Sequence, residues 1–297
     1  FFYVNRPSLA ELVATPQPMR EKMRAIGADY MARRLAGESK DPGAIFAYRH
    51  RTAEIDRASM TADFGWDPAK PVICVYGANW FDFPHSVEMI NFRDFQDWIE
   101  ATLEVACTTP QVNWLFKAHP CDDWYPEALG PSFGALVDAV DAPNVKLVPK
   151  TWNGHSIMRL IDGGITYFGT IGLELPSMGK PVLVADRGWY AEHGFVVWPG
   201  DRNTYLEALR RSWWQEFDGT EAKMMATEFI GWYFGAPEWH GEYIFPDDSE
   251  QELIYEGLPT FLKRFEAEIV RETTLIRDWV ANGHRYYQVY KMLEETR

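Results

Sequence analysis

The stretch of residues 162–195 constrains the fold of this chain more than any other part of the sequence. Residues 165–168 are a short run rich in β-formers, and the small residues Gly169 to Gly172 follow as a tight turn. Residues 173–178 have helical character, and a Gly-Lys-Pro sequence ends that helix before the apolar residues 182–184. This order predicts strand, turn, helix and strand, which is one βαβ unit of a parallel sheet.

The turn of this unit is a candidate ligand site. It follows the carboxyl end of its strand, where open α/β sheets bind ligands, and backbone N–H groups at the start of a helix can face a phosphate. Glu174 lies one turn into the helix, where its carboxylate can reach a sugar hydroxyl.

Three further strands precede this unit. Near-continuous apolar runs, typical of strands covered on both faces, occupy residues 71–76, 112–116 and 145–148. Four helices are predicted around them. Asn91 caps the first, which has Phe92, Phe95, Ile99, Leu103 and Ala106 on one face. The second and third span residues 133–140 and 156–161, and Asp201 caps the last. Five strands separated by helices predict an α/β fold with one Rossmann-like parallel sheet.

Helical segments flank this predicted sheet on both sides. Residues 1–67 show no strand pattern, but Ser8 is placed to cap a short helix, and apolar residues recur at helical spacing from Met19 onward. We therefore expect a helical N-terminal segment, a Rossmann-like domain at 68–215, and C-terminal helices at 216–297 that pack back on the sheet or its cleft. The C-terminal helices are expected at residues 224–233, 253–268 and 273–293.

Composition limits the function. The formal net charge of -14 argues against a general nucleic-acid or anionic-membrane surface, because such a surface needs a basic field. Three scattered cysteines, Cys74, Cys107 and Cys121, suit neither a disulfide framework nor a zinc site, which favours a reducing cytoplasm. No apolar run reaches the roughly 18 residues of a membrane span, and no signal peptide opens the sequence. We expect a cytoplasmic protein without a transmembrane segment, and peripheral membrane association stays open.

The loop after the first predicted strand, residues 77–86, occupies a ligand-facing position on such a sheet. Sugar transfer needs a carboxylate that accepts the proton of the acceptor hydroxyl or stabilises an oxocarbenium ion, and Asp82 can serve as that carboxylate. Trp80 and His85 are candidate substrate contacts, since aromatic rings stack on sugars and a histidine can stabilise a leaving group. The alternative for this loop is an Asx-turn with a surface histidine.

The second predicted strand ends at Lys117, and His119 and Pro120 follow it. A histidine held by the restricted backbone before a proline can donate a hydrogen bond to a nucleotide phosphate. Sugar transfer leaves the nucleotide with extra negative charge, so a donor at that phosphate stabilises the transition state. We therefore predict His119 as a nucleotide-binding and catalytic residue, with Lys117 as a second nucleotide contact. The alternative is a structural histidine.

The central unit resembles a known family. Its pattern T-x-G-x-E-x₄-GKPV, followed by Gly188-Trp189-Tyr190-x₃-Gly194-Phe195, is similar to the nucleotide-sugar half of GT-B glycosyltransferases of the bacterial capsule-polysaccharide-biosynthesis type. The His119-Pro120 pair resembles the HP motif of capsule transferases and bacterial sialyltransferases. A weaker likeness is to the UDP-N-acetylglucosamine 2-epimerases, whose corresponding helix also carries a glutamate five residues before its Gly-Lys-Pro.

The resemblance implies a site and an activity. Gly169, Thr170, Gly172 and Glu174 would hold the phosphate and ribose of a nucleotide, and Tyr190 would contact the substrate. Residues 1–67 would be a remnant of an acceptor domain. The chain would transfer a hexosyl, Kdo or sialyl unit from a CMP- or UDP-sugar to a surface-polysaccharide or glycolipid acceptor, with no metal and no cofactor besides the nucleotide-sugar co-substrate.

Two other functions stay open. A nucleotide-sugar epimerase would release a changed sugar without any acceptor, and a degenerate GT-B half would only bind a sugar nucleotide or a partner. No G-x-S-x-G elbow, Walker loop or H-E-x-x-H motif supports another catalytic class. His155, beside Asn153, is expected to cap the next helix or to lie near the nucleotide base, and the adjacent Asp122 and Asp123 are expected to be solvated rather than metal-binding.

Overall fold

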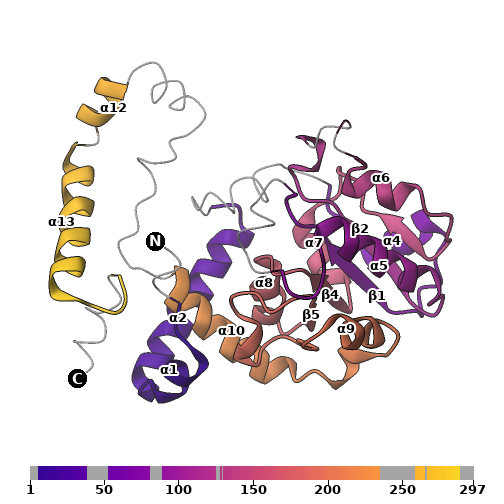
Figure 1. Cartoon of the computed structure of the whole chain (residues 1–297), viewed down its shortest axis with the longest axis horizontal. Helices are drawn as coiled ribbons and strands as arrows, with labels where there is room; N and C mark the ends of the chain where they lie inside the picture. Colours follow the sequence, from indigo (N-terminus) through magenta and orange to yellow (C-terminus); the bar gives the residue numbers. More distant parts are fainter. Residues whose placement is uncertain are drawn as a thin grey trace. The chain divides into compact units, whose positions relative to one another are not determined.

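The computed structural model describes residues 6–38, 53–80, 89–124, 128, 130–234, 258–264 and 266–287. The chain divides into two compact units, Phe1–Arg49 with Thr227–Arg297, and His50–Ala226. The second unit contains the whole sheet (Figure 1). The domain boundaries expected near residues 67 and 215 remain predictions.

A five-stranded parallel sheet forms the centre of the second unit. Its strands lie in the order β3-β2-β1-β4-β5, and every pairing is parallel. The strands are β1 (Val72–Tyr76), β2 (Asn113–Lys117), β3 (Val145–Leu147), β4 (Gly163–Thr166) and β5 (Val182–Val184). The chain adds β2 and β3 on one side of β1 and then β4 and β5 on the other side, which is a Rossmann-like topology. The predicted fold class is therefore confirmed.

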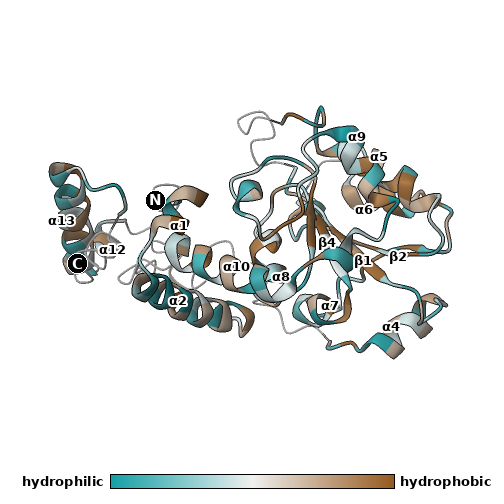
Figure 2. Ribbon diagram, turned by 90° about the horizontal axis from the view of Figure 1, so that it is seen from below, coloured by the Kyte–Doolittle hydropathy of each residue, from teal (hydrophilic) through white to brown (hydrophobic). Residues whose placement is uncertain are grey.

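Helices cover both faces of the sheet, as Figure 2 shows. One face carries α5 (Phe95–Cys107), α6 (Phe133–Asp138) and α9 (Arg202–Leu209), and the other carries α7 (Gly154–Leu160) and α8 (Ile171–Ser177). The helix α4 (Arg57–Phe64) precedes β1, and short 3-10 turns span Asp122–Trp124, Ala191–His193 and Trp213–Glu216. The strands are apolar (brown in Figure 2), because both faces of the sheet are buried.

The helix α5 packs on the sheet through the face that its apolar spacing predicted. The buried residues of this face include Phe95, Ile99, Leu103 and Ala106. The N-cap is Asp94, whose carboxylate accepts the Asp97 N–H at 2.8 Å. The prediction of Asn91 as the cap is wrong, because its side-chain amide donates to the Ala185 carbonyl at 2.9 Å instead.

The strand β4 begins two residues earlier than the predicted run 165–168. A Cβ on Gly164 would lie 2.3 Å from Leu175 Cδ1, and a Cβ on Gly163 would lie 3.1 Å from the Trp213 ring. These glycines let α8 and the chain after α9 approach the sheet closely. Glycine is rare inside strands, so β-propensity does not predict these two positions.

The first unit is helical in its described residues. Its helices are α1 (Leu9–Ala14), α2 (Gln17–Leu35), the end of α10 (Gly219–Phe234), α12 (Leu258–Arg264) and α13 (Glu266–Asn282). Ser8 caps α1 as predicted, in a reciprocal capping box with Glu11. The break predicted between residues 268 and 273 is wrong, because α13 runs without interruption from Glu266 to Asn282. Among the described residues, no helix combines the length and apolar character needed to cross a bilayer.

Two glycines bring α2 and α10 together at their backbones. A Cβ on Gly231 would lie 1.9 Å from the carbonyl oxygen of Met23, and one on Gly27 would lie 2.0 Å from a carbonyl oxygen of α10. Beside this contact, Arg20 and Glu228 form an ion pair of 2.9 Å, and Glu228 is 1% exposed. The crossing therefore depends on the missing side chains of the two glycines.

We expect Gly231→Ala to lower the free energy of unfolding by about 1 to 3 kcal/mol, because the added methyl group must push two backbones apart. Lys223→Ala, at an exposed position of the same helix, is the matched control and should change it by less than about 0.5 kcal/mol. Urea denaturation followed by fluorescence measures both variants. Equal stability of the two variants would contradict the backbone contact.

Candidate functional site

The carboxyl ends of four parallel strands lie side by side at one edge of the sheet. Lys117 of β2 pairs with Tyr76 of β1, Tyr76 pairs with Thr166 of β4, and Thr166 pairs with Val184 of β5. Because the strand order reverses between β1 and β4, the switch point at which such sheets bind ligands lies there. The chain segments with His119 and with the Gly169 turn follow β2 and β4 at this same edge, as expected.

The segment after β1 begins at this edge. Gly77 donates its N–H to the Lys117 carbonyl at 2.9 Å, and Trp80 is partly buried against the hydrophobic core. The predicted base Asp82 and the predicted substrate contact His85 lie in residues 81–88, outside the described part of the chain. Their roles remain predictions.

His119 is partly exposed and its ring is oriented by the backbone. Nδ1 accepts the N–H of Cys121 at 3.2 Å, so the proton of the neutral imidazole is on Nε2. Asp122 then fixes the chain after His119, because its carboxylate oxygens accept the N–H groups of Phe133 and Gly134 at 3.0 and 3.1 Å. This anchoring to the start of α6 lets His119 act as a hydrogen-bond donor at a defined position.

Lys117 is a partly buried cation at the end of β2. A Cβ on Gly154 would lie 3.6 Å from Lys117 Cε, so the lysine side chain runs along the start of α7. Burial lowers the pKa of the Lys117 ammonium, and the negative charge of Glu174 partly offsets that effect. Lys117 and Glu174, predicted as two nucleotide contacts, are thus within electrostatic reach of each other.

The turn before α8 exposes Gly169 and Thr170, whereas the helix itself is buried from Ile171 to Pro176. Several N–H groups of this turn are already engaged. Gly169 donates to Thr166 Oγ1 at 3.2 Å, Gly172 to the Gly169 carbonyl at 3.0 Å, and Glu174 to the Thr170 carbonyl at 3.1 Å. The turn therefore presents fewer backbone donors to a phosphate than the sequence pattern suggests.

Glu174 and Tyr190 are both deeply buried. Glu174 is 4% exposed and Tyr190 is 0% exposed. The Tyr190 hydroxyl donates to the Gly169 carbonyl at 2.6 Å, and a Cβ on Gly172 would lie 2.0 Å from the Tyr190 oxygen. Tyr190 thus packs on the turn and holds it in place, and its ring is not presented to a ligand as the sequence suggested.

A buried carboxylate that the sequence did not single out organises this edge. Asp186, 2% exposed and two residues past β5, accepts four hydrogen bonds: from the N–H groups of Ile90 and Asn91 at 2.9 and 3.1 Å, from the Tyr167 hydroxyl at 2.5 Å, and from the Arg187 N–H at 2.7 Å. Asp186 thereby fixes Ile90 and Asn91, which lie between β1 and α5, next to the end of β5. The only signal in the sequence is an acid directly after an apolar strand, which is too common to identify it.

Within the described residues, no group of three or more histidine, cysteine or acidic side chains is arranged to hold a metal ion. Asp122 and Asp123, considered from the sequence, are engaged elsewhere: Asp122 binds the start of α6, and Asp123 pairs with Lys150.

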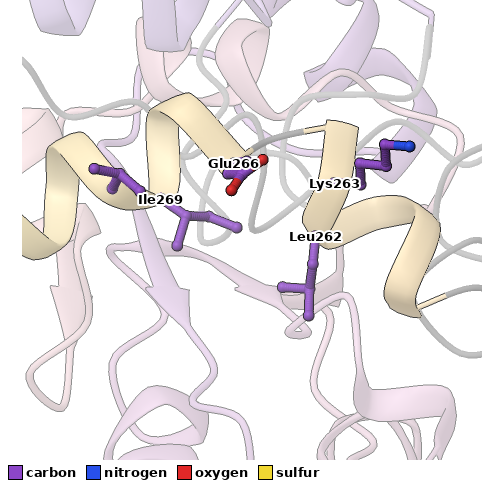
Figure 3. Close-up of a pocket in the computed structure, with 5 residues that line it drawn as sticks. Leu262, Lys263, Glu266 and Ile269 are labelled. Carbon is purple, nitrogen blue, oxygen red and sulfur yellow. The ribbon is translucent and has the colours of Figure 1, made fainter.

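A small open hollow lies between α12 and α13 (Figure 3). Its lining residues are Leu262, Lys263, Glu266, Ile269 and Val270. None of the site residues predicted from the sequence lines this hollow, and none of its residues belongs to the sheet edge.

The chain matches no family model and no curated protein. Solved structures that resemble it include KpsC of Thermosulfurimonas dismutans, a β-Kdo 2,4-transferase, with 16% identity, a TM-score of 0.45, and coverage of 77% of this chain and 62% of that one. The UDP-GlcNAc 2-epimerase of Neisseria meningitidis bound to UDP-GlcNAc has 20% identity, a TM-score of 0.37, and coverage of 60% and 46%. MnaA of S. aureus with UDP has 13% identity, a TM-score of 0.38, and coverage of 61% and 46%.

This chain therefore spans less than two thirds of each of these solved structures. These structures include a Kdo transferase and a UDP-GlcNAc 2-epimerase, and the sequence motifs resemble those of glycosyltransferases and of 2-epimerases. At these identities the likeness concerns the arrangement of sheet and helices alone.

We expect Asp186→Asn to lower the free energy of unfolding by about 2 to 3 kcal/mol, because an amide nitrogen would face one of the N–H groups that the carboxylate now accepts. Asp123→Asn is the matched control at an exposed ion pair and should cost about 0.5 kcal/mol or less. Urea denaturation of both variants decides the matter. A cost at Asp186 no larger than at Asp123 would show that this carboxylate does not anchor the edge.

Proposed function

We propose that this chain is the donor-binding part of a glycosyltransferase that uses a nucleotide-activated sugar, with a CMP- or UDP-sugar as the donor. The acceptor would be a hydroxyl group of a surface polysaccharide or a glycolipid. The nucleotide would bind at the carboxyl edge of the sheet, over the switch point between β1 and β4.

One observation carries this proposal: Lys117 ends β2, His119 follows it, and the exposed turn at Gly169 and Thr170 follows β4, so that all of them lie at one edge of the sheet. Together they offer positive charge and hydrogen-bond donors for a phosphate. The chain as a whole has a formal net charge of -14, so cationic groups at this edge are a local feature.

The proposed chemistry is transfer of a glycosyl group to a hydroxyl. The acceptor oxygen bonds to the anomeric carbon, the bond from that carbon to the phosphate oxygen breaks, and its electron pair leaves with the nucleotide. Lys117 and His119 would stabilise the negative charge that develops on the phosphate, and Asp82 would take the proton of the acceptor. The Lys117 ammonium supplies the positive charge in this scheme, which needs no metal.

Calorimetric titration with CMP, UDP, GDP and ADP tests the nucleotide site directly. We expect CMP or UDP to bind, because the proposed donor is a CMP- or UDP-sugar. Absence of binding by all four would overturn the proposal. If a nucleotide binds, incubation with the matching sugar nucleotide separates the activities: release of an altered sugar without an acceptor would instead indicate an epimerase, and binding without any turnover a binding module.

A second prediction concerns Glu174. If its carboxylate accepts hydrogen bonds from the ribose hydroxyls, Glu174→Ala should weaken nucleotide binding by about 1.5 to 3 kcal/mol, and Glu174→Gln should weaken it less, because one acceptor oxygen and the shape remain. The matched control is Glu192→Gln, since Glu192 is an exposed partner of Arg187, and it should leave the affinity unchanged.

Because Glu174 is buried, the melting temperature and the nucleotide affinity must be measured on the same Glu174 variants. A lower melting temperature with unchanged affinity would assign Glu174 to the scaffold alone. A loss of affinity in Glu174→Gln with little loss of stability is the result that the proposal requires.

A further inference from the structure

Trp124 departs from the burial of the other large aromatic side chains. Its side chain is 64% exposed, and it is the only aromatic among the exposed large apolar side chains that the structure describes. An exposed indole forgoes the free energy that its burial would supply. Single exposed apolar residues are nevertheless common, so the position of the ring decides what its exposure indicates.

Three contacts place the turn that carries Trp124 at the carboxyl edge of the sheet. The N–H of Asp122 donates to the carbonyl of His119, two residues past β2, at 2.9 Å. The Asp122 carboxylate accepts two N–H groups at the start of α6, at 3.0 and 3.1 Å. Asp123 forms an ion pair with Lys150, which follows β3. The turn is therefore tied to the chain that follows two neighbouring strands of the candidate site.

The backbone of Trp124 is fixed although its ring is exposed. Its N–H donates to the Cys121 carbonyl at 3.0 Å, and the Cys121 N–H donates to Nδ1 of His119 at 3.2 Å. The same short segment thus orients the His119 ring and holds Trp124. A ring on a fixed turn loses little conformational freedom when a ligand packs on it, so this arrangement suits a binding contact.

The charges beside the ring discriminate between classes of ligand. Asp122 and Asp123 directly precede Trp124, so an anionic phosphate is disfavoured at the ring. The Asp123–Lys150 ion pair is exposed to solvent, and covering it with an acyl chain would cost free energy. An uncharged sugar fits both features, because its C–H face packs on an indole ring and its hydroxyl groups form hydrogen bonds with carboxylate and ammonium groups.

We propose that Trp124 is an acceptor-binding residue whose indole ring packs on an uncharged sugar of the acceptor saccharide, beside the ion pair of Asp123 and Lys150. The assignment of this saccharide as the acceptor rests on the proposed function, whereas the contact with a saccharide does not. The nucleotide would lie over the switch point between β1 and β4, and the turn with Trp124 is tied to the ends of β2 and β3. Donor and acceptor would therefore occupy neighbouring parts of the same edge.

Fluorine NMR of the full chain labelled with fluorotryptophan detects this contact directly. Each of the thirteen tryptophans gives one resonance, and the resonance that is missing from Trp124→Phe belongs to Trp124. The probes are uncharged oligosaccharides of glucose, galactose, mannose and N-acetylglucosamine. We expect at least one of them to shift the Trp124 resonance. Its affinity should fall about 10-fold in Trp124→Ala and stay within about 3-fold in Trp124→Phe, which keeps an aromatic ring.

Val13→Ala, at a similarly exposed apolar position on α1, is the matched control and should bind the oligosaccharide like the unsubstituted protein. No shift of the Trp124 resonance by any oligosaccharide, or an unchanged affinity in Trp124→Ala, would overturn the inference. Self-association that is seen by analytical ultracentrifugation and lost in Trp124→Ala would also overturn it, because the ring would then contact a second copy of the chain.

Titration of the same variants with CMP and UDP separates this inference from the proposed function. A loss of nucleotide affinity in Trp124→Ala would place the ring on the donor and overturn the acceptor contact. Oligosaccharide binding through Trp124 without binding of any nucleotide would overturn the proposed function and leave the saccharide contact standing. Nucleotide binding without any oligosaccharide binding would do the reverse.

Discussion

The candidate site depends on the close packing of β4, α8 and the Tyr190 ring, which only glycine permits. A Cβ on Gly164 would collide with Leu175, and one on Gly172 would collide with the Tyr190 hydroxyl. Without side chains at these two positions, α8 lies directly on the sheet and Tyr190 lies directly on α8. The buried Tyr190 ring then packs against the turn between β4 and α8, and its hydroxyl donates a hydrogen bond to the Gly169 carbonyl. Because the turn is fixed in this way, its exposed residues can keep a defined position for a ligand.

Most of the fold could be predicted from local patterns, because the decisive features lie within short stretches of sequence. Apolar runs identified all five strands to within about two residues, and side chains such as Ser8 and Asp201 cap the helices that they were expected to cap. The cap of α5 was predicted wrongly, because two nearby residues have side chains that can cap a helix. Asn91 and Asp94 are both suitable caps, and a distant carbonyl at Ala185 decides which of them caps α5.

The candidate site was less predictable, because its details depend on contacts between residues far apart in the sequence. The position of each group at the edge follows from strand order, so Lys117, His119 and Thr170 could be expected there. Burial cannot be inferred in the same way: the motif does not show that the side chains of Glu174 and Tyr190 are enclosed. Asp186 was missed because its four donors come from the chain before α5, from Tyr167 and from its own neighbour Arg187.

The negative charge of Glu174 favours the charged form of the lysine at the end of β2. Residues Asn113 to Phe116 of this strand are buried, and Lys117, the last residue of the strand, is partly buried. This burial disfavours the charged form of the lysine. An apolar side chain such as methionine would avoid that cost, so the fold by itself gives no reason for an ammonium group there. The Glu174 carboxylate reduces the cost without removing it. A phosphate bound at this edge, as proposed, would relieve more of this penalty and make the charged lysine more stable in the complex than in the free protein.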